Sequence, residues 1–154
     1  MKTVAAAIAL IALLGAAQTN PKRIYQLKDY GVAPISVGKA KLKAWIADTD
    51  SKRQEGMMFL TDKEVPKDGA MLFVFPSAAE RKFWMHNTLI PLDIAYIDEK
   101  FVVISVAAMK AKDDSGVPSK GAAMYVLEMK NGAFKRLGIK VGQKLVIPTN
   151  IKAQ

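Results

Sequence analysis

The chain has 154 residues, of which 51% are hydrophobic and 24% are charged, and its formal net charge is +9. This composition is typical of a single globular domain and excludes collagen-like repeats and long disordered tails. Because the sequence has no cysteine and only one histidine, it also excludes disulfides, thiolate metal sites, a catalytic cysteine and a metal site built from several histidines of one chain.

The first residues predict a secretory signal peptide. Lys2 gives a positively charged start, residues 4–14 form an uninterrupted apolar run, and Gly15 to Ala17 supply the small residues of a cleavage site. The run is shorter than the roughly 20 residues that a membrane span needs. We therefore expect cleavage after Ala17 and an exported protein, periplasmic or extracellular, without a membrane span. An uncleaved N-terminal anchor is the alternative.

The basic residues lie mainly in the two flanking thirds of the exported chain, before residue 57 and after residue 100. This excess indicates an anionic envelope component as a partner, or it serves only to keep the surface soluble. No nucleic acid is expected, because the sequence has no arginine-rich helix or recognisable nucleic-acid module. We expect residues 18–38 to form a separate N-terminal segment and residues 39–150 to form a single domain.

From residue 39 onward, apolar and polar residues often alternate with a period of two, which favours β-strands. In chain order we expect strands at 39–46, 69–75, 83–85, 93–98, 101–106, 122–129 and 144–147, and short helical segments at 48–56 and 131–138. No alternation of strands with long helices occurs. The sequence thus predicts a mainly β fold, a compact β-barrel or sandwich of about seven short strands with one or two short helices.

The densest motif is the run FWMHNTLIPLDI at residues 83–94. With it occur Ala47-Asp48-Thr49, Arg53, Gly56-Met57-Met58-Phe59, Met71 to Phe75, Tyr125 to Glu128, Gly132, Gly138-Ile139 and Gly142. On these segments, which span residues 39–147, the sequence resembles the domain of unknown function 192 family of bacteria and archaea. The resemblance implies a small β-barrel-like fold and, for many members, export.

The resemblance implies no reaction, so it carries no catalytic residues to this chain. Two residues depart from the usual pattern of the family, which often has leucine at the position of Met57 and lysine or arginine at that of His86. A third departure is the segment after the predicted hairpin, where the family tends to have a proline and this chain has residues 107–110 without one.

Several polar residues of the motif are candidates for ligand binding. Asn87, Thr88 and Asp93 stand among apolar residues. They could line a pocket in which Trp84 is an apolar platform and Asn87 orients the ligand. The alternative is structural, since Asn and Thr side chains build tight turns and Asp93 could accept backbone N–H groups.

His86 is the one side chain whose ordinary pKa lies near neutrality. It could act as a general base oriented by Asp93. A solvated surface histidine is the alternative. No G-x-S-x-G motif accompanies it, and no serine has the sequence context of a nucleophile.

Arg53 and Glu128 form the other candidate pair. Glu128 follows an apolar stretch of a predicted strand, and a buried carboxylate needs a partner. Arg53 could supply a bidentate ion pair. This pair is either a structural salt bridge or part of a site in which Arg53 binds an anionic ligand.

The composition favours no cofactor and no metal. Thioethers can hold Cu(I), but the methionines beyond the signal are scattered over strand-like positions, where they fill a core. We therefore expect a non-catalytic binding or envelope-associated protein. A hydrolase acting on an envelope carbohydrate or peptide is the alternative, and a Met-based metal-binding protein is the second alternative.

Overall fold

The computed structural model describes residues 19–154, so the predicted signal peptide at residues 1–17 lies outside the described residues. Within the described part, no helix is both long and apolar enough to cross a membrane. This part contains nine strands, two short α-helices and one 3-10 turn, which confirms the predicted mainly β class. The elements are β1 (Gly31–Val37), β2 (Ala40–Ala47), α1 (Asp50–Glu55), β3 (Ala70–Ala79), β4 (Lys82–Phe83), β5 (Leu92–Ile97), β6 (Val103–Met109), β7 (Val117–Pro118), β8 (Ala123–Lys130), α2 (Ala133–Leu137) and β9 (Leu145–Val146), with the 3-10 turn at Leu27–Asp29.

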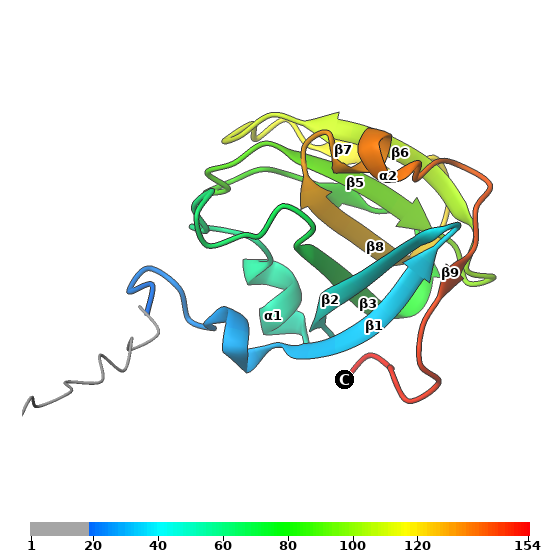
Figure 1. Cartoon of the computed structure of the whole chain (residues 1–154), viewed down its shortest axis with the longest axis horizontal. Helices are drawn as coiled ribbons and strands as arrows, with labels where there is room; N and C mark the ends of the chain where they lie inside the picture. The colour runs from blue at the N-terminus through cyan, green and yellow to red at the C-terminus, as the bar shows by residue number, and fades with distance from the viewer. Residues whose placement is uncertain (1–18) are drawn as a thin grey trace, which may run out of the picture.

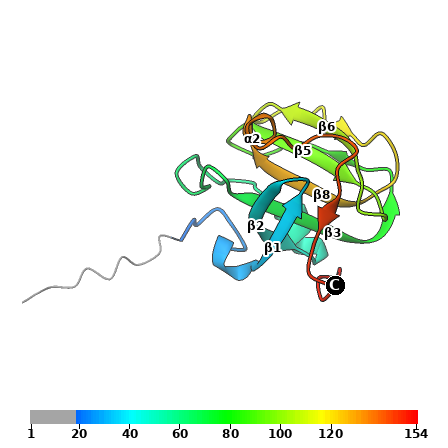
Figure 2. The same cartoon turned by 45° about the vertical axis from the view of Figure 1, so that its right-hand side comes forward.

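Seven strands form one curled sheet in the order β6-β5-β8-β3-β2-β1-β9, and β4 pairs with β7 in a small second sheet. Only β2 and β3 run parallel among the paired strands of residues 19–154. The two edges of the large sheet meet, because Val102 bridges to Lys144 and the amide of Leu145 donates to the carbonyl of Phe101 at 2.8 Å. Figures 1 and 2 show the curl and the position of β9 beside β1. The sheet is therefore a small barrel, as the sequence predicts.

Strand β1 was not among the strands expected from the sequence, and the reason lies in Pro34. A proline inside an apolar run argues against a central strand, because it cannot donate to a ladder. Here β1 has a full antiparallel partner on one side, where Pro34 lies opposite Lys43. On its other side β9 pairs only with Ser36 and Val37. Pro34 thus occupies an edge-like position, where its missing donor is tolerated.

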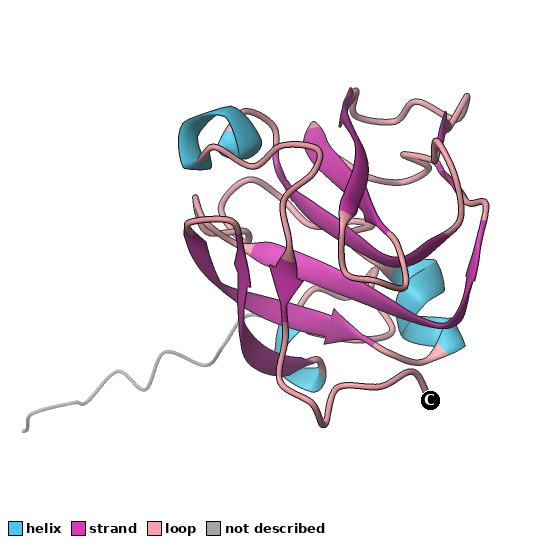
Figure 3. Cartoon of the chain, turned by 90° about the vertical axis from the view of Figure 1, so that its right-hand side faces the viewer, coloured by secondary structure: helices cyan, strands magenta, loops and turns pink. Residues whose placement is uncertain are grey.

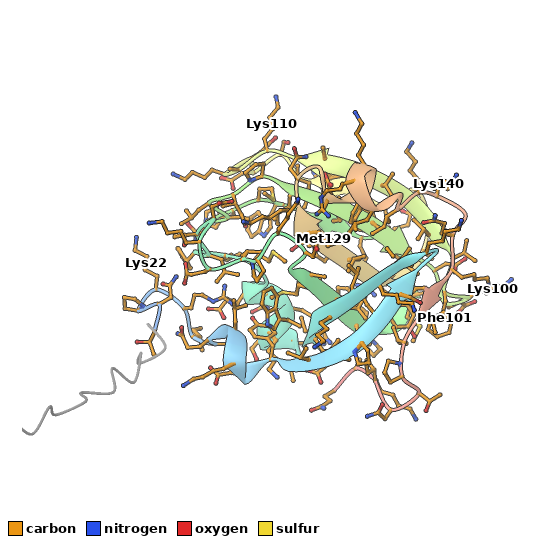
Figure 4. All side chains as sticks on the ribbon, in the orientation of Figure 1. Lys22, Lys100, Phe101, Lys110, Met129 and Lys140 are labelled. Carbon is orange, nitrogen blue, oxygen red and sulfur yellow. The ribbon has the colours of Figure 1, made fainter. Side chains whose placement is uncertain are left out.

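The alternating strands supply two separate apolar cores, one on each face of the sheet. The first core lies on the concave side and contains Leu42, Leu72, Leu127 and Met129. The second core lies on the outer face and contains Phe73, Ile94 and Tyr96 among others. Figure 4 shows Met129 inside the fold while Lys100, Lys110 and Lys140 point outward. The short helices lie at the periphery of the curled sheet (Figure 3).

Helix α1 covers part of the outer core and confirms the helical segment predicted at residues 48–56. Thr49 is its N-cap, and the side chain of Thr49 accepts from the amide of Lys52 at 3.3 Å. Gly56 ends the helix with a φ of 48°, a conformation that glycine adopts without steric strain. The chain then continues over the sheet, where Met57 and Leu60 are buried in the outer core.

The N-terminal segment is fixed to α1 by a buried ion pair. The guanidinium of Arg23 lies 3.4 Å from the carboxylate of Glu55, and both side chains are almost wholly buried. Arg23 also donates to the carbonyls of Gly56 and Met58. Glu55 in turn accepts the amides of Ile24 and Tyr25 at 2.6 and 3.0 Å. These bonds hold the segment that precedes β1 against the outer core.

Candidate functional site

A pocket of about 670 Å³ opens on the outer face of the sheet, between α1 and β4. Its walls are strongly aromatic and contain Phe59, Phe73, Phe75, Phe83 and Trp84. These rings come from the segment after α1, from β3, and from β4 with the residue that follows it. We call this cavity the site pocket. Polar and charged side chains also line it. A pocket of this size that combines aromatic walls with polar side chains is typical of small-molecule sites.

Glu128 of β8 supplies a carboxyl group to the site pocket. Its side chain shares the outer face with the neighbouring sheet residues Met71 and Ile94, and the residue is only 4% exposed. No group in residues 19–154 forms a hydrogen bond or ion pair with it, and burial in this apolar setting raises the pKa of Glu128 to about 8. The carboxyl group is therefore mostly protonated at neutral pH.

Arg53 lines the site pocket from α1, but its guanidinium is already bound. It lies 2.6 Å from the carboxylate of Asp50, three residues earlier on the same helix. It also donates to the carbonyls of Asp48 and Val74 at 2.6 and 2.7 Å. The ion pair with Glu128 considered from the sequence is not formed within residues 19–154, because these closer acceptors hold the arginine.

Trp84 stands at the rim, where its side chain is 55% exposed. Its ring stacks on His86 with a centroid distance of 5.0 Å. Nδ1 of His86 lies 3.0 Å from the carboxylate of Asp114, in the loop between β6 and β7. The partner of His86 is thus Asp114 and not Asp93. Both side chains are well exposed, so the pair supports the indole from the solvent side.

Asp93 lies on β5 and is not in the lining of the site pocket; its carboxylate is bound at the start of α2. Its two carboxylate oxygens accept from the backbone amide of Phe134 and from the side-chain amide of Asn131, each at 2.9 Å. Asp93 is 6% exposed. The structure therefore gives it the backbone-binding position that the sequence offered as the structural alternative, away from His86.

Asn87 and Thr88 hold the loop that carries Trp84. Asn87 has a φ of 53°, and its carbonyl accepts from the amide of Phe59, which has a φ of 61°. Such values are uncommon outside glycine, and asparagine tolerates them best. This bond ties the segment of Phe59, which lines the site pocket, to the motif loop. Thr88 is buried, lines the site pocket, and donates to the carbonyl of His86 at 3.3 Å.

Four of the seven residues predicted for a site thus line one cavity: Arg53, Trp84, Thr88 and Glu128. His86, Asn87 and Asp93 are not in its lining. The sequence did not predict the phenylalanines of the lining as site residues, because an aromatic residue at a strand position usually indicates the hydrophobic core. It also missed Arg81, whose guanidinium stacks 3.4 Å from the ring centroid of Phe75.

Three other features bear on the candidate sites. No cluster of three or more His, Asp or Glu side chains is placed to hold a metal ion within residues 19–154. Met57 and Met58 line the site pocket, whereas Met85 is buried in the outer core. A second groove of about 700 Å³ lies between the ends of β3 and β8 and the C-terminal segment, and Met124 is in its lining.

Comparisons with known proteins agree with this fold. The sequence model of the family DUF192, described as "Uncharacterized ACR, COG1430", matches residues 33–147. A proposed transcription regulator from Sinorhizobium meliloti 1021 has a TM-score of 0.71 at 27% identity, over 77% of this chain and 95% of its own. A protein of unknown function from Novosphingobium aromaticivorans DSM 12444 has a TM-score of 0.70 at 29% identity, over 80% and 91%. No curated protein matches the chain.

Proposed function

The chain belongs to the DUF192 family of uncharacterised proteins, and we propose that it is an exported, non-catalytic protein that binds a small molecule in the site pocket. One observation carries this proposal: a buried carboxyl group without a partner, Glu128, in an aromatic-walled cavity. Glu128 is nearly buried, but its carboxyl oxygens are not among the fully enclosed side-chain atoms without a partner, so they remain accessible from the site pocket. A ligand that supplied a hydrogen-bond or ion-pair partner there would make a polar contact in a largely apolar setting, so the arrangement favours a binding site.

The described residues favour binding over the hydrolase alternative. A hydrolytic site needs at least two ionisable groups within hydrogen-bond reach in an open cleft. In the site pocket, Arg53 is paired with Asp50, and Glu55 is paired with Arg23. Glu128 has no second ionisable group within hydrogen-bond distance among residues 19–154. A carboxyl group with a raised pKa, such as that of Glu128, can also act as a general acid. The hydrolase is therefore the second candidate.

Export and the envelope partner rest on sequence features. Export follows from the predicted signal peptide at residues 1–17. An anionic envelope component remains a proposed partner for the basic surface, where Lys39, Lys41 and Lys43 of the β1–β2 hairpin are exposed. Its binding is a separate proposal from that of the small molecule, because these lysines are not part of the site pocket lining.

Blocking the site pocket should remove the bound molecule. Met58 is half-buried and lines the site pocket, so Met58→Trp fills the cavity with a larger side chain. Met124→Trp is the matched control, because Met124 is also half-buried but lines the second groove. Native mass spectrometry of protein recovered from the exported fraction should show a retained small molecule with the wild type and with Met124→Trp, and none with Met58→Trp.

Thermal unfolding would first establish that both variants are folded. The same retained molecule on all three proteins, or none on the wild type, would contradict the proposed site. Recovery of the protein from the cytoplasm alone would overturn export.

A further inference from the structure

The charged side chains that line the site pocket differ in how many hydrogen bonds and ion pairs they already make with other protein groups. The charged residues in its lining are Lys22, Asp50, Arg53, Glu55, Lys82 and Glu128. Arg53 is bound to Asp50 and to two backbone carbonyls. Glu55 is bound to Arg23 and to two backbone amides. The groups left for a ligand are the buried carboxyl of Glu128 and two exposed lysines.

The two lysines are weak candidates for anchoring a ligand. Both Lys22 and Lys82 are solvent-exposed, and Lys22 extends outward from the N-terminal segment (Figure 4). Exposed ion pairs contribute little because water and salt screen them. Glu128, in contrast, lies in an apolar setting where a charge partner is screened far less. The strongest unmet interaction in the site pocket is therefore with a positive group.

The aromatic walls favour a positive group as well. The faces of aromatic rings carry negative electrostatic potential and attract cations. The site pocket already shows this interaction at Phe75, where Arg81 lies 3.4 Å and Arg53 5.3 Å from the ring centroid. Phe59, Phe83 and Trp84 contribute further rings to the same cavity, and none of these three has a cation over it within residues 19–154.

We propose that the site pocket takes a small organic amine, whose protonated amino group pairs with the carboxylate of Glu128 while its apolar body contacts the aromatic walls. This assignment rests on the proposed function and names the chemical class of its ligand. An anionic ligand would have to approach Glu128 and would find Arg53 already bound. A neutral alcohol could bond with the carboxyl group but would gain nothing from the potential of the rings.

Binding of the amine is coupled to the loss of a proton. In the free protein the carboxyl of Glu128 is mostly protonated at neutral pH, because its pKa is raised by burial. When the ammonium group binds, the O–H bond breaks, the proton passes to the buffer, and a carboxylate–ammonium ion pair remains. Besides the charged residues of the lining named above, Tyr96 of β5 also faces Glu128, and its pKa is raised by burial and then, in smaller part, by Glu128.

Isothermal titration calorimetry with three probes tests the ligand class. 2-Phenylethylamine, 2-phenylethanol and phenylacetate share an aromatic body and differ in the charge of the polar group. At pH 8 the amine should bind the wild type about tenfold more tightly than the alcohol, with phenylacetate the weakest, as expected for a charge-assisted bond in an apolar site. The variant Glu128→Gln should reduce the preference to less than about threefold, and the exposed-site control Glu99→Gln should leave it unchanged.

Proton release is the second readout. At pH 7, titrations in phosphate and Tris buffers should show close to one proton released per amine bound to the wild type, and none with Glu128→Gln. Equal binding of amine and alcohol, tighter binding of phenylacetate, no proton release, or no binding of any probe would each overturn the amine assignment. The mass-spectrometric comparison of the methionine variants decides independently whether the site pocket holds a molecule at all.

Discussion

Replacing Glu128 with glutamine should stabilise the protein at alkaline pH by several kcal/mol, although the change removes a charged residue. The pKa of the buried carboxyl is raised from the usual 4.5 to about 8. Between these values the unfolded chain has lost the proton and the folded protein retains it. Proton loss with rising pH therefore favours unfolding. Above pH 8 the folded protein must bury an unpaired carboxylate, at an expense on the order of 5 kcal/mol relative to a neutral side chain.

Urea denaturation of the wild type and of Glu128→Gln checks this expectation. The free energy of unfolding of the wild type should decline steadily from pH 5 to pH 8 relative to the variant. Below pH 4.5 the two curves should converge, because both states of the wild type are then protonated. Glu99→Gln, at an exposed position, should follow the wild type throughout. A constant difference between Glu128→Gln and the wild type from pH 4 to pH 9 would contradict a raised carboxyl pKa.

The largest destabilisation should follow the substitution Arg23→Met. Arg23 and Glu55 form a nearly solvent-free ion pair, and removal of the arginine leaves the carboxylate buried without its charge partner. Breaking one side of such a pair typically lowers the free energy of unfolding by about 3–5 kcal/mol. Arg23 also bonds to the carbonyls of Gly56 and Met58, which flank Met57 at the edge of the site pocket. We therefore expect Arg23→Met to weaken ligand binding in the site pocket as well as to lower the free energy of unfolding.

A double-mutant cycle separates the charge effect from the loss of packing. Glu55→Gln keeps an oxygen that can accept the backbone amides of Ile24 and Tyr25 but removes the charge. Urea denaturation should show that the double variant is more stable than the sum of the two single changes predicts, by about 1–3 kcal/mol. Additive effects, or a loss below about 1 kcal/mol for Arg23→Met, would show that the pair does not fix the N-terminal segment.

Most of the fold could be predicted from the sequence, because the strands of the barrel show an alternation of apolar and polar residues. The period of two over residues 40–46 places Leu42, Ala44 and Ile46 in the concave core, as one face of a strand requires. The same logic missed β1, where Pro34 interrupts the apolar run. It also could not predict that Phe101 and Leu145 bond across the closing edge, since such pairing depends on the curl of the entire sheet.

The candidate site was predictable only in part. The sequence predicts Trp84 and Thr88 as site residues because they belong to the dense motif of residues 83–94. It predicts Arg53 because an arginine in the helical segment could pair with a buried carboxylate. The partners were not accessible to sequence reasoning. Asp114 contacts His86 from a loop 28 positions further along the chain. Asp93, which the sequence offered as the partner of His86, instead accepts hydrogen bonds at the start of α2. The apolar strand around Glu128 predicts a buried carboxylate, but whether that carboxylate has a partner depends on how α1 and β8 are arranged in the fold.

Carbon-13 NMR of the side-chain carboxyl of Glu128 tests the central claim most directly, because it observes the group on which the binding proposal depends. In the free protein the carboxyl resonance should titrate with a midpoint near 8. Saturation with 2-phenylethylamine should move the midpoint well below neutrality, since the ammonium group stabilises the carboxylate. A midpoint near 4.5 in the free protein, unchanged by the amine, would contradict both the unpaired buried carboxyl and its role in binding.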